Sequence, residues 1–317
     1  MPRFAKFAWG LLAYNLLVIA WGAYVRASGS GAGCGAHWPL CNGEVLPRAP
    51  GVEMLVELSH RITSGLSLLG GLALAIAAHR TYPRGSVVRR GAWTAFGLVG
   101  AEALIGAGLV LFELVAHDKS MKRGLSMALH LTNTFFLLAA LTLTAFWASG
   151  GARVSLRRQG VVAWSLGLAV AFMLVLGMSG AVTALGDTLF PVHSVSEGLL
   201  QEISTGAHIF VRLRLLHPVI ATLTAVVVLL AATLARLLRP TRLVRKLSLT
   251  VSLLIVAQMI AGIANVALLA PIPMQLVHLL LADSVWIALI LLAASALRAP
   301  EAHALPGPSA EGGVLSY

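Results

Sequence analysis

The sequence predicts an all-α integral membrane protein in which eight transmembrane helices form two pseudo-symmetric four-helix bundles. Three observations predict this fold. First, 58% of the 317 residues are hydrophobic and 11% are charged, and a soluble domain has no interior large enough for so much apolar surface. Second, the apolar stretches are continuous, which favours helices over the alternating strands of a membrane barrel. Third, several sequence landmarks of the first half recur in the second.

Eight stretches are long enough to cross a bilayer, which takes about 20 apolar residues in a helix. They are 7–26, 57–79, 91–113, 125–147, 160–182, 212–237, 247–270 and 274–297. The first stretch is of spanning length and lacks a small-residue cleavage site. We therefore expect it to be a retained helix rather than a signal peptide.

The net charge of +11 is explained by the connections between helices. Most Lys and Arg residues precede the first stretch or lie in every second connection, as Arg84, Arg89 and Arg90 do. Cytoplasmic loops of membrane proteins collect such residues. The distribution therefore predicts a multi-pass protein of the cell membrane with both termini in the cytoplasm, and it argues against a nucleic-acid partner.

The two halves are predicted to be residues 1–147 and 160–297, joined by a basic cytoplasmic linker at 148–159. A tail at 298–317, rich in Pro, Gly and Ala, is expected to be disordered. Four landmarks recur at offsets of about 150 residues: Gly22 as Gly177, His60 as His217, Glu102 as Gln258, and His130 as His278. An even number of helices per half predicts parallel repeats.

Cys34 and Cys41, the two cysteines of the chain, lie in the predicted outer loop 27–56. A disulfide that closes this short loop is the favoured interpretation on the oxidising side of a bacterial membrane. Two free thiols are the alternative. A metal site is less favoured, because His37 is the only nearby residue that adds a third ligand.

Four of the ten histidines fall within the second, fourth, sixth and eighth predicted helices, near one membrane face. They are His60, His130, His217 and His278. An ionisable side chain in hydrocarbon is costly and suggests a function, although a lone neutral imidazole often just hydrogen-bonds a neighbouring helix. Two pairs on facing helices favour axial ligation of heme, His60 with His130 and His217 with His278. Zinc fits poorly, since two histidines leave it under-ligated.

The neighbours of the two pairs differ. Glu57 precedes His60 by three residues and is a candidate for proton handling, or it simply pairs with Arg61. Arg214 stands at the matching position before His217, where it is suited to bind a heme propionate. Arg61 and Arg214 are therefore expected to lie beside bound heme. Glu102 is interpreted mainly as a hydrogen-bonded packing residue, with a proton relay as the alternative. Asp283, five residues after His278, is expected to lie beside the heme ligands rather than to take part in the chemistry.

Several motifs together resemble the heme A synthase family of bacteria, which has eight transmembrane helices. The motifs are Gly22 to Cys34, Trp38 to Gly43, Glu57 to Arg61, and His130 to Asn133, and the resemblance extends over essentially the whole chain. Two positions depart from the commonest family pattern. Gly35-Ala36-His37 follows the first cysteine where Cys-Pro-Asp-Trp is more usual, and Pro218 stands where Arg is typical.

The resemblance implies an oxidoreductase that converts the C8 methyl group of heme O, through hydroxylation, into the formyl group of heme A for terminal cytochrome oxidases. It implies heme b on His217 and His278, substrate heme O at His60 and His130, and Glu57 as the catalytic residue. It also implies a Cys34–Cys41 disulfide. Heme O synthase and the assembly of cytochrome oxidase are the partners that it suggests.

Two other functions compete with this one: a non-catalytic diheme b-type cytochrome that transfers electrons, and a heme transporter. An electron conduit requires two similar heme sites, whereas Glu57 and the cysteines occur in one half only. A transporter more often has broken helices at the midplane of the membrane. The asymmetry between the halves therefore favours an enzyme.

Overall fold

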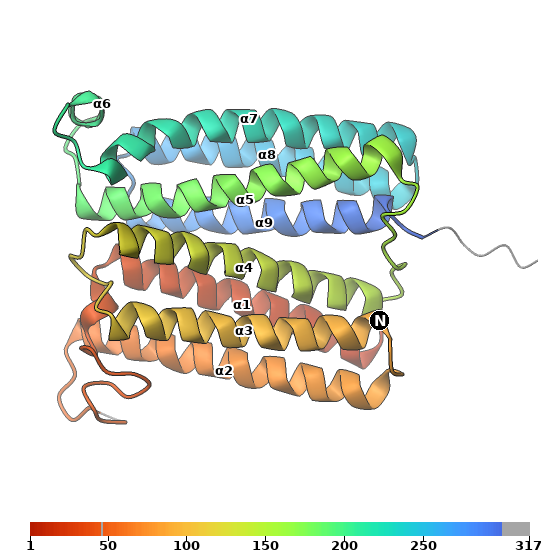
Figure 1. Cartoon of the computed structure of the whole chain (residues 1–317), viewed down its shortest axis with the longest axis horizontal. Coiled ribbons are helices and arrows are strands. Elements are labelled where there is room, and N and C mark those ends of the chain that lie inside the picture. The colour runs from red at the N-terminus through yellow and green to blue at the C-terminus, as the bar shows by residue number, and fades with distance from the viewer. Residues whose placement is uncertain (46, 300–317) are drawn as a thin grey trace, which may run out of the picture.

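The computed structural model describes residues 1–45 and 47–299, which fold almost entirely into helices (Figure 1). The first bundle contains α1 (Arg3–Ala27), the short 3-10 helix η1 (Ser30–Ala32), α2 (Val52–Thr81), α3 (Val87–Leu111) and α4 (Met121–Ala148). The second contains α5 (Gly160–Leu189), α6 (Val195–Ile203), α7 (Ile209–Leu238), α8 (Arg242–Ala267) and α9 (Ile272–Ala296). All of these except η1 and α6 are long and apolar enough to cross a membrane. The chain is thus a multi-pass membrane protein, as the sequence predicts.

Each bundle is a ring of four helices. In the first, α1 and α3 each pack against both α2 and α4, so that α2 and α4 lie on one diagonal. In the second, α5 and α8 each pack against both α7 and α9, which form the corresponding diagonal. The helices on the two diagonals are the ones that carry the four intramembrane histidines.

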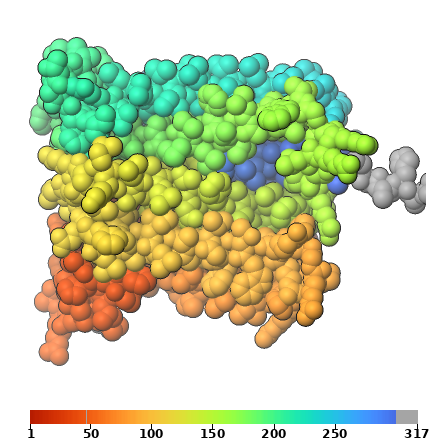
Figure 2. All heavy atoms as spheres, in the orientation of Figure 1, coloured from red at the N-terminus to blue at the C-terminus, as the bar shows by residue number. Residues whose placement is uncertain are grey.

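The two bundles meet along α1 and α4 of the first and α5 and α9 of the second (Figures 1 and 2). The rings of Phe135 and Trp286 stack across this interface with their centroids 4.8 Å apart. The indole N–H of Trp286 also donates to the carbonyl oxygen of Phe135 at 2.7 Å. Both side chains are almost fully buried, and such a satisfied aromatic contact fixes the register of the two halves.

The two ends of the molecule differ in character. The N-terminus and the end of α9 lie at one end, together with the Arg-rich connections, while loop 27–56 and α6 lie at the other (Figure 1). The linker between the halves is pinned at the first end, because Ser155 N–H donates to Leu297 O at 2.8 Å and Ala299 N–H donates to Arg153 O at 2.9 Å. Residues 300–317 of the tail expected to be disordered lie outside the described residues.

Sequence reasoning missed α6, which lies inside the second long outer loop. Its nine residues are too few to cross a membrane, so a search for apolar spans passes over it. A local signal was nevertheless present. Ser194 Oγ accepts from the N–H of Glu197, as an N-cap does, and the Glu197 carboxylate accepts from the N–H of His193, one residue before the cap. The pair resembles a capping box shifted by one residue.

Candidate functional site

The four intramembrane histidines lie at similar depth, close to the end that bears loop 27–56. Each follows the start of its helix by six to nine residues, which corresponds to about 9–14 Å along the axis. His60 and His130 are within electrostatic reach of each other across the first bundle, as are His217 and His278 across the second. The fold therefore brings the histidines together in the two predicted pairs.

Glycines on neighbouring helices face three of the four imidazole rings. A Cβ atom added to Gly22 of α1 would lie 2.8 Å from Cε1 of His60. A Cβ atom at Gly180 of α5 would lie 3.1 Å from Cε1 of His217, and one at Gly262 of α8 would lie 3.1 Å from Cε1 of His278. A residue larger than glycine at any of these three positions would push the facing imidazole ring out of its present place.

The glycine that matches Gly22 by sequence spacing does not lie against a histidine. Gly177, which the spacing matches to Gly22, instead faces Phe135, whose Cε2 would lie 2.8 Å from an added Cβ. Gly180 is the glycine that lies against His217. Three residues are nearly one helical turn, so spacing in the sequence alone does not distinguish two glycines on similar faces of α5.

The first pair has an acid as its neighbour. The carboxylate of Glu102 on α3 contacts Nδ1 of His130. Thr134, one turn after His130 on α4, donates its hydroxyl to Glu102 Oε1 at 2.9 Å. Glu102 is therefore held between a histidine and a hydroxyl, a position that suits both alternatives raised by the sequence, packing and proton relay.

The second pair has neutral neighbours. Ser179 Oγ lies 2.8 Å from Nδ1 of His217, which leaves Nε2 of that ring free to face the bundle interior. Gln258, the repeat counterpart of Glu102, lies with Nε2 3.3 Å from Nε2 of His278. The two sites thus share their histidine geometry and differ in the charge beside it.

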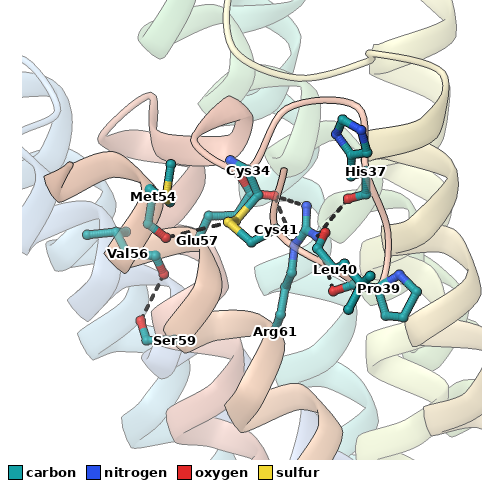
Figure 3. Close-up of a disulfide and its surroundings, with 10 residues drawn as sticks. All are labelled: Cys34, His37, Pro39, Leu40, Cys41, Met54, Val56, Glu57, Ser59 and Arg61. Carbon is teal, nitrogen blue, oxygen red and sulfur yellow. Dashed lines mark hydrogen bonds and ion pairs between the residues drawn. A yellow bond between two sulfur atoms is a disulfide. The ribbon is translucent and has the colours of Figure 1, made fainter. Parts of the chain in front are cut away.

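Glu57 joins helix α2 to the disulfide loop (Figure 3). Cys34 and Cys41 are bonded to each other, as the favoured interpretation predicts. Glu57 is buried; its Oε2 accepts from the backbone N–H of Cys34 at 2.8 Å and its Oε1 accepts from Arg61 Nη2 at 2.5 Å. The i,i+4 ion pair weighed for these two residues is therefore present.

Arg61 holds the same loop by its backbone. Its Nη1 donates to the carbonyl oxygens of His37 and Leu40, each at 2.7 Å, and more weakly to Pro39 O at 3.4 Å (Figure 3). These contacts turn the guanidinium toward the loop. His37, weighed as a third metal ligand, contributes its carbonyl oxygen to this cap.

Arg214 binds the end of α5. Its Nη2 donates to Gly186 O at 2.5 Å and to Phe190 O at 2.7 Å, while its Nε lies 3.0 Å from the Asp187 carboxylate. Glu202 of α6 lies near this ion pair; burial raises the pKa of Glu202, and the positive charge of Arg214 opposes that rise. Arg214 is thus part of the outer rim of the second bundle. Its Nη1 takes part in none of these three interactions.

Arg26 belongs to α1 of the first half but binds the second. Its Nη1 donates to Ala184 O and to Thr188 Oγ1 on α5, each at 2.7 Å. Its Nη2 donates to Gln275 Oε1 on α9 at 2.8 Å. Gln275 precedes His278 by one turn, so Arg26 ties the first half directly to a helix that carries a histidine of the second.

The donor set fits heme better than a bare metal ion. Among the described residues, no three His, Cys, Asp or Glu side chains are grouped to hold a metal, whereas a porphyrin needs only two axial ligands from the protein. Nδ1 of His60 and Nδ1 of His278 are buried without a hydrogen-bond partner in the described chain. A buried nitrogen without a partner calls for an explanation, and ligation of a group that is absent from the structure supplies one.

Asp283 is the remaining acid that the sequence singled out. It is completely buried in α9, and neither carboxylate oxygen has a hydrogen-bond partner among the described residues. Within the part of the chain that the structure describes, Asp283 forms no hydrogen bond or ion pair with a histidine, so its expected place beside the heme ligands stays a prediction.

A comparison with models of protein families shows to which family the chain belongs. The model of the family described as "Cytochrome oxidase assembly protein" (COX15-CtaA) matches residues 5–290. The chain belongs to this family. The match covers both histidine pairs, the disulfide loop and Glu57, so the family relationship extends to both halves of the molecule.

Curated relatives fall into two groups. Proteins named "Protoheme IX farnesyltransferase" from two strains of Thermus thermophilus are 54% and 53% identical over 296 residues, which is 93% of this chain and 49% of theirs. The chain thus spans about half the length of these relatives. A "Heme A synthase" of Alkalihalophilus pseudofirmus is 38% identical over 133 residues, 42% of each chain. One of an Exiguobacterium species is 32% identical over 173 residues, 55% of each.

Some residues around the histidines escaped sequence reasoning. Ser179, Gly180 and the contact of Arg26 with the second half carry no motif of their own. The one available signal was the order of small residues on α5, where Ser179 and Gly180 follow Gly177. It does not reveal which of them faces His217.

Proposed function

We propose that the chain is a heme A synthase that oxidises the C8 methyl group of heme O to the formyl group of heme A. Family membership and the partial matches to proteins named heme A synthase support this activity. The observation that carries the proposal is the difference between the two histidine pairs. Two acids adjoin the first pair, Glu57 on α2 bonded to the disulfide-closed loop and Glu102 beside His130, whereas neutral partners adjoin the second pair.

The second bundle is proposed to hold heme b between His217 and His278. When bound, that group supplies an iron centre able to accept and donate single electrons. Ser179 orients the ring of His217, and Gly180 and Gly262 allow the two imidazole rings to pack closely against α5 and α8. Nη1 of Arg214 is the donor still available for a propionate at the rim.

The first bundle is proposed to bind the substrate, heme O, between His60 and His130. Glu57 lies one turn before His60 and is the proposed catalytic residue, because a carboxylate is suited to take or deliver a proton. The Arg61 ion pair and the Cys34 N–H fix the direction of its carboxylate. Glu102 behind His130 is a second acid that can polarise that ligand.

The longer relatives suggest where the substrate comes from. In them, a segment resembling this chain shares a polypeptide with further sequence under the name protoheme IX farnesyltransferase. A farnesylated heme is the expected substrate of this chain, and it is too apolar to diffuse readily through water. We therefore propose that the chain works beside a heme O synthase in the cell membrane and supplies heme A to the assembly of cytochrome oxidase. Its Arg-rich end and termini are proposed to face the cytoplasm.

Coexpression with a heme O synthase tests the activity. Reversed-phase chromatography of extracted hemes should reveal heme A, or its hydroxylated precursor, in cells that contain the chain and not in cells with the synthase alone. Heme-loaded, folded protein that yields neither product would contradict the proposal and would favour an electron-transfer cytochrome.

The role of Glu57 needs a comparison that separates chemistry from loop structure. Glu57→Gln should retain heme in both bundles and lose at least about 100-fold in turnover, the usual scale for a lost proton-transfer group. Glu53→Gln, an exposed acid in the first turn of the same helix, is the matched control. If a Cys34→Ser, Cys41→Ser variant loses the same activity, Glu57 acts through the loop; if Glu57→Gln is fully active, the carboxylate is structural.

A further inference from the structure

A basic cavity lies at the end of the molecule opposite to loop 27–56, where α2 turns into α3. Its volume is about 550 Å³, and it is lined chiefly by Arg84, Arg89, Arg90, His79 and Trp93. The proposed reaction uses none of these residues, because all four intramembrane histidines lie toward the other end.

The charge of this cavity is unbalanced. No Asp or Glu occurs between Glu57 and Glu102 in the sequence. Within the described chain, none of the three arginines forms an ion pair. The cavity also adjoins the N-terminus of α3, whose first N–H groups receive no side-chain cap from Ser86 and carry a partial positive charge. The chemistry of the lining therefore selects an anion.

The lining side chains are held in place rather than extended at random into water. Arg89 Nη2 lies 3.0 Å from Nε2 of His79, and the His79 ring meets the edge of Trp93 with the centroids 6.4 Å apart. Arg90 Nη2 donates to Gly85 O at 3.3 Å. Gly85 itself has a φ of +83°, which permits the tight turn between α2 and α3. Arg84 makes no side-chain hydrogen bond within the described chain, so its guanidinium is available to a ligand.

Exposed apolar side chains of α2 and α3 lie next to the cavity, on its side toward the middle of the two helices. Ile76, one turn before His79 on α2, is 40% exposed, and Trp93 is 41% exposed. Farther along α3, Leu104 is 69% exposed. In a membrane-spanning helix such side chains face lipid, and Trp is typical of the boundary between hydrocarbon and headgroups. A ligand seated here has its charge among arginines and any apolar part along α2 and α3.

We propose that this cavity binds an anionic glycerophospholipid, with its phosphate among Arg84, Arg89 and Arg90 and its acyl chains along α2 and α3. Arginine recognises phosphate through paired N–H donors, and basic pockets at the ends of membrane helices suit anionic headgroups. The Arg-rich connection between α7 and α8 differs. The smaller cavity at Arg239 and Arg298, about 250 Å³, has Arg239 bonded to the side-chain oxygen of Gln159 at 3.1 Å.

Native mass spectrometry of the full chain, titrated with phosphatidylglycerol, phosphatidylcholine or inorganic phosphate, tests the proposal. The triple variant Arg84→Gln, Arg89→Gln, Arg90→Gln should bind phosphatidylglycerol about 10-fold or more weakly than the native chain. The matched control Arg242→Gln, Arg245→Gln, Lys246→Gln removes the same charge from exposed positions at the start of α8 and should bind normally.

Three results would overturn the proposal. Equal weakening by the control triple would mean that only net charge matters. Equal affinity for phosphatidylcholine would show that the site does not select anionic lipid. Binding of inorganic phosphate that matches the lipid would identify a site for a soluble anion. Should the triple variant fail to fold, Arg84→Gln alone decides, because no internal hydrogen bond is lost; unchanged phosphatidylglycerol affinity in that variant contradicts the proposal.

Discussion

Arg26 on α1 donates a hydrogen bond of 2.8 Å to the side chain of Gln275 on α9, and thereby joins the two halves of the molecule one turn away from His278. In the sequence, Arg26 belongs to the motif that precedes Cys34 and looks like a feature of the first half. In the structure its three side-chain bonds all end on the second half. The helix that carries His278 is therefore held in place in part by a residue from the other bundle.

Replacement of Arg26 by Gln should destabilise the fold and loosen the second site. Three hydrogen bonds from a charged donor are lost, each with a net contribution of about 1.5–3 kcal/mol, so we expect the free energy of unfolding to fall by at least about 4 kcal/mol. Thermal unfolding and the visible spectrum of bound heme b measure the two effects. Arg48→Gln, in the exposed part of loop 27–56, is the control. Native values for both quantities in Arg26→Gln would refute the proposed coupling.

Gly22→Ala should disturb the first site specifically. The added methyl group would lie 2.8 Å from Cε1 and 3.0 Å from Nε2 of His60, which forces the ring or helix α1 to move. Gly10→Ala on the same helix meets no atom within 4 Å and should be neutral or slightly stabilising. Heme content per bundle, read from extracted hemes, should fall for heme O and stay native for heme b. An equal effect of the two substitutions would show that the contact is unimportant.

Ser179→Ala should weaken the second site without unfolding the protein. The substitution removes the partner of Nδ1 of His217, and loss of such an orienting hydrogen bond typically costs 10–100-fold in metal affinity. Ser165→Ala on the same helix removes only a bond to the carbonyl of Val162 in its own helix and serves as the control. Heme b retention during dialysis is the measurement. Retention that is native in both variants would mean that packing alone orients His217.

The double substitution Cys34→Ser, Cys41→Ser should lower stability by about 2–3 kcal/mol, the value expected when a disulfide closes so short a loop. Peptide mapping by mass spectrometry without reductant should find the two cysteines linked in the native chain. Reductant should then lower the unfolding temperature of the native chain and leave the double variant unchanged. Alkylation of both thiols in untreated membranes would contradict the bonded state.

Much of the fold follows from local properties of the sequence. Continuous apolar stretches define the eight spans, because any long stretch of that kind finds its minimum of free energy in hydrocarbon. The four histidines stand out for the opposite reason, since each is costly there. The spacing of Glu57 and Arg61 also indicates their ion pair, because residues four apart share one face of a helix.

The rotation of each helix about its axis, and the contacts between the two halves, were decided only by the tertiary structure. In a bilayer the lipid and the protein core are both apolar, so a uniformly apolar helix does not reveal which face turns inward. Sequence spacing therefore selected Gly177 where packing selects Gly180, and it left Arg26 in the half where its motif lies. Composition and spacing determined the spans and the histidines; packing across the interface between the bundles determined what surrounds each pair, because those contacts join residues more than 150 positions apart.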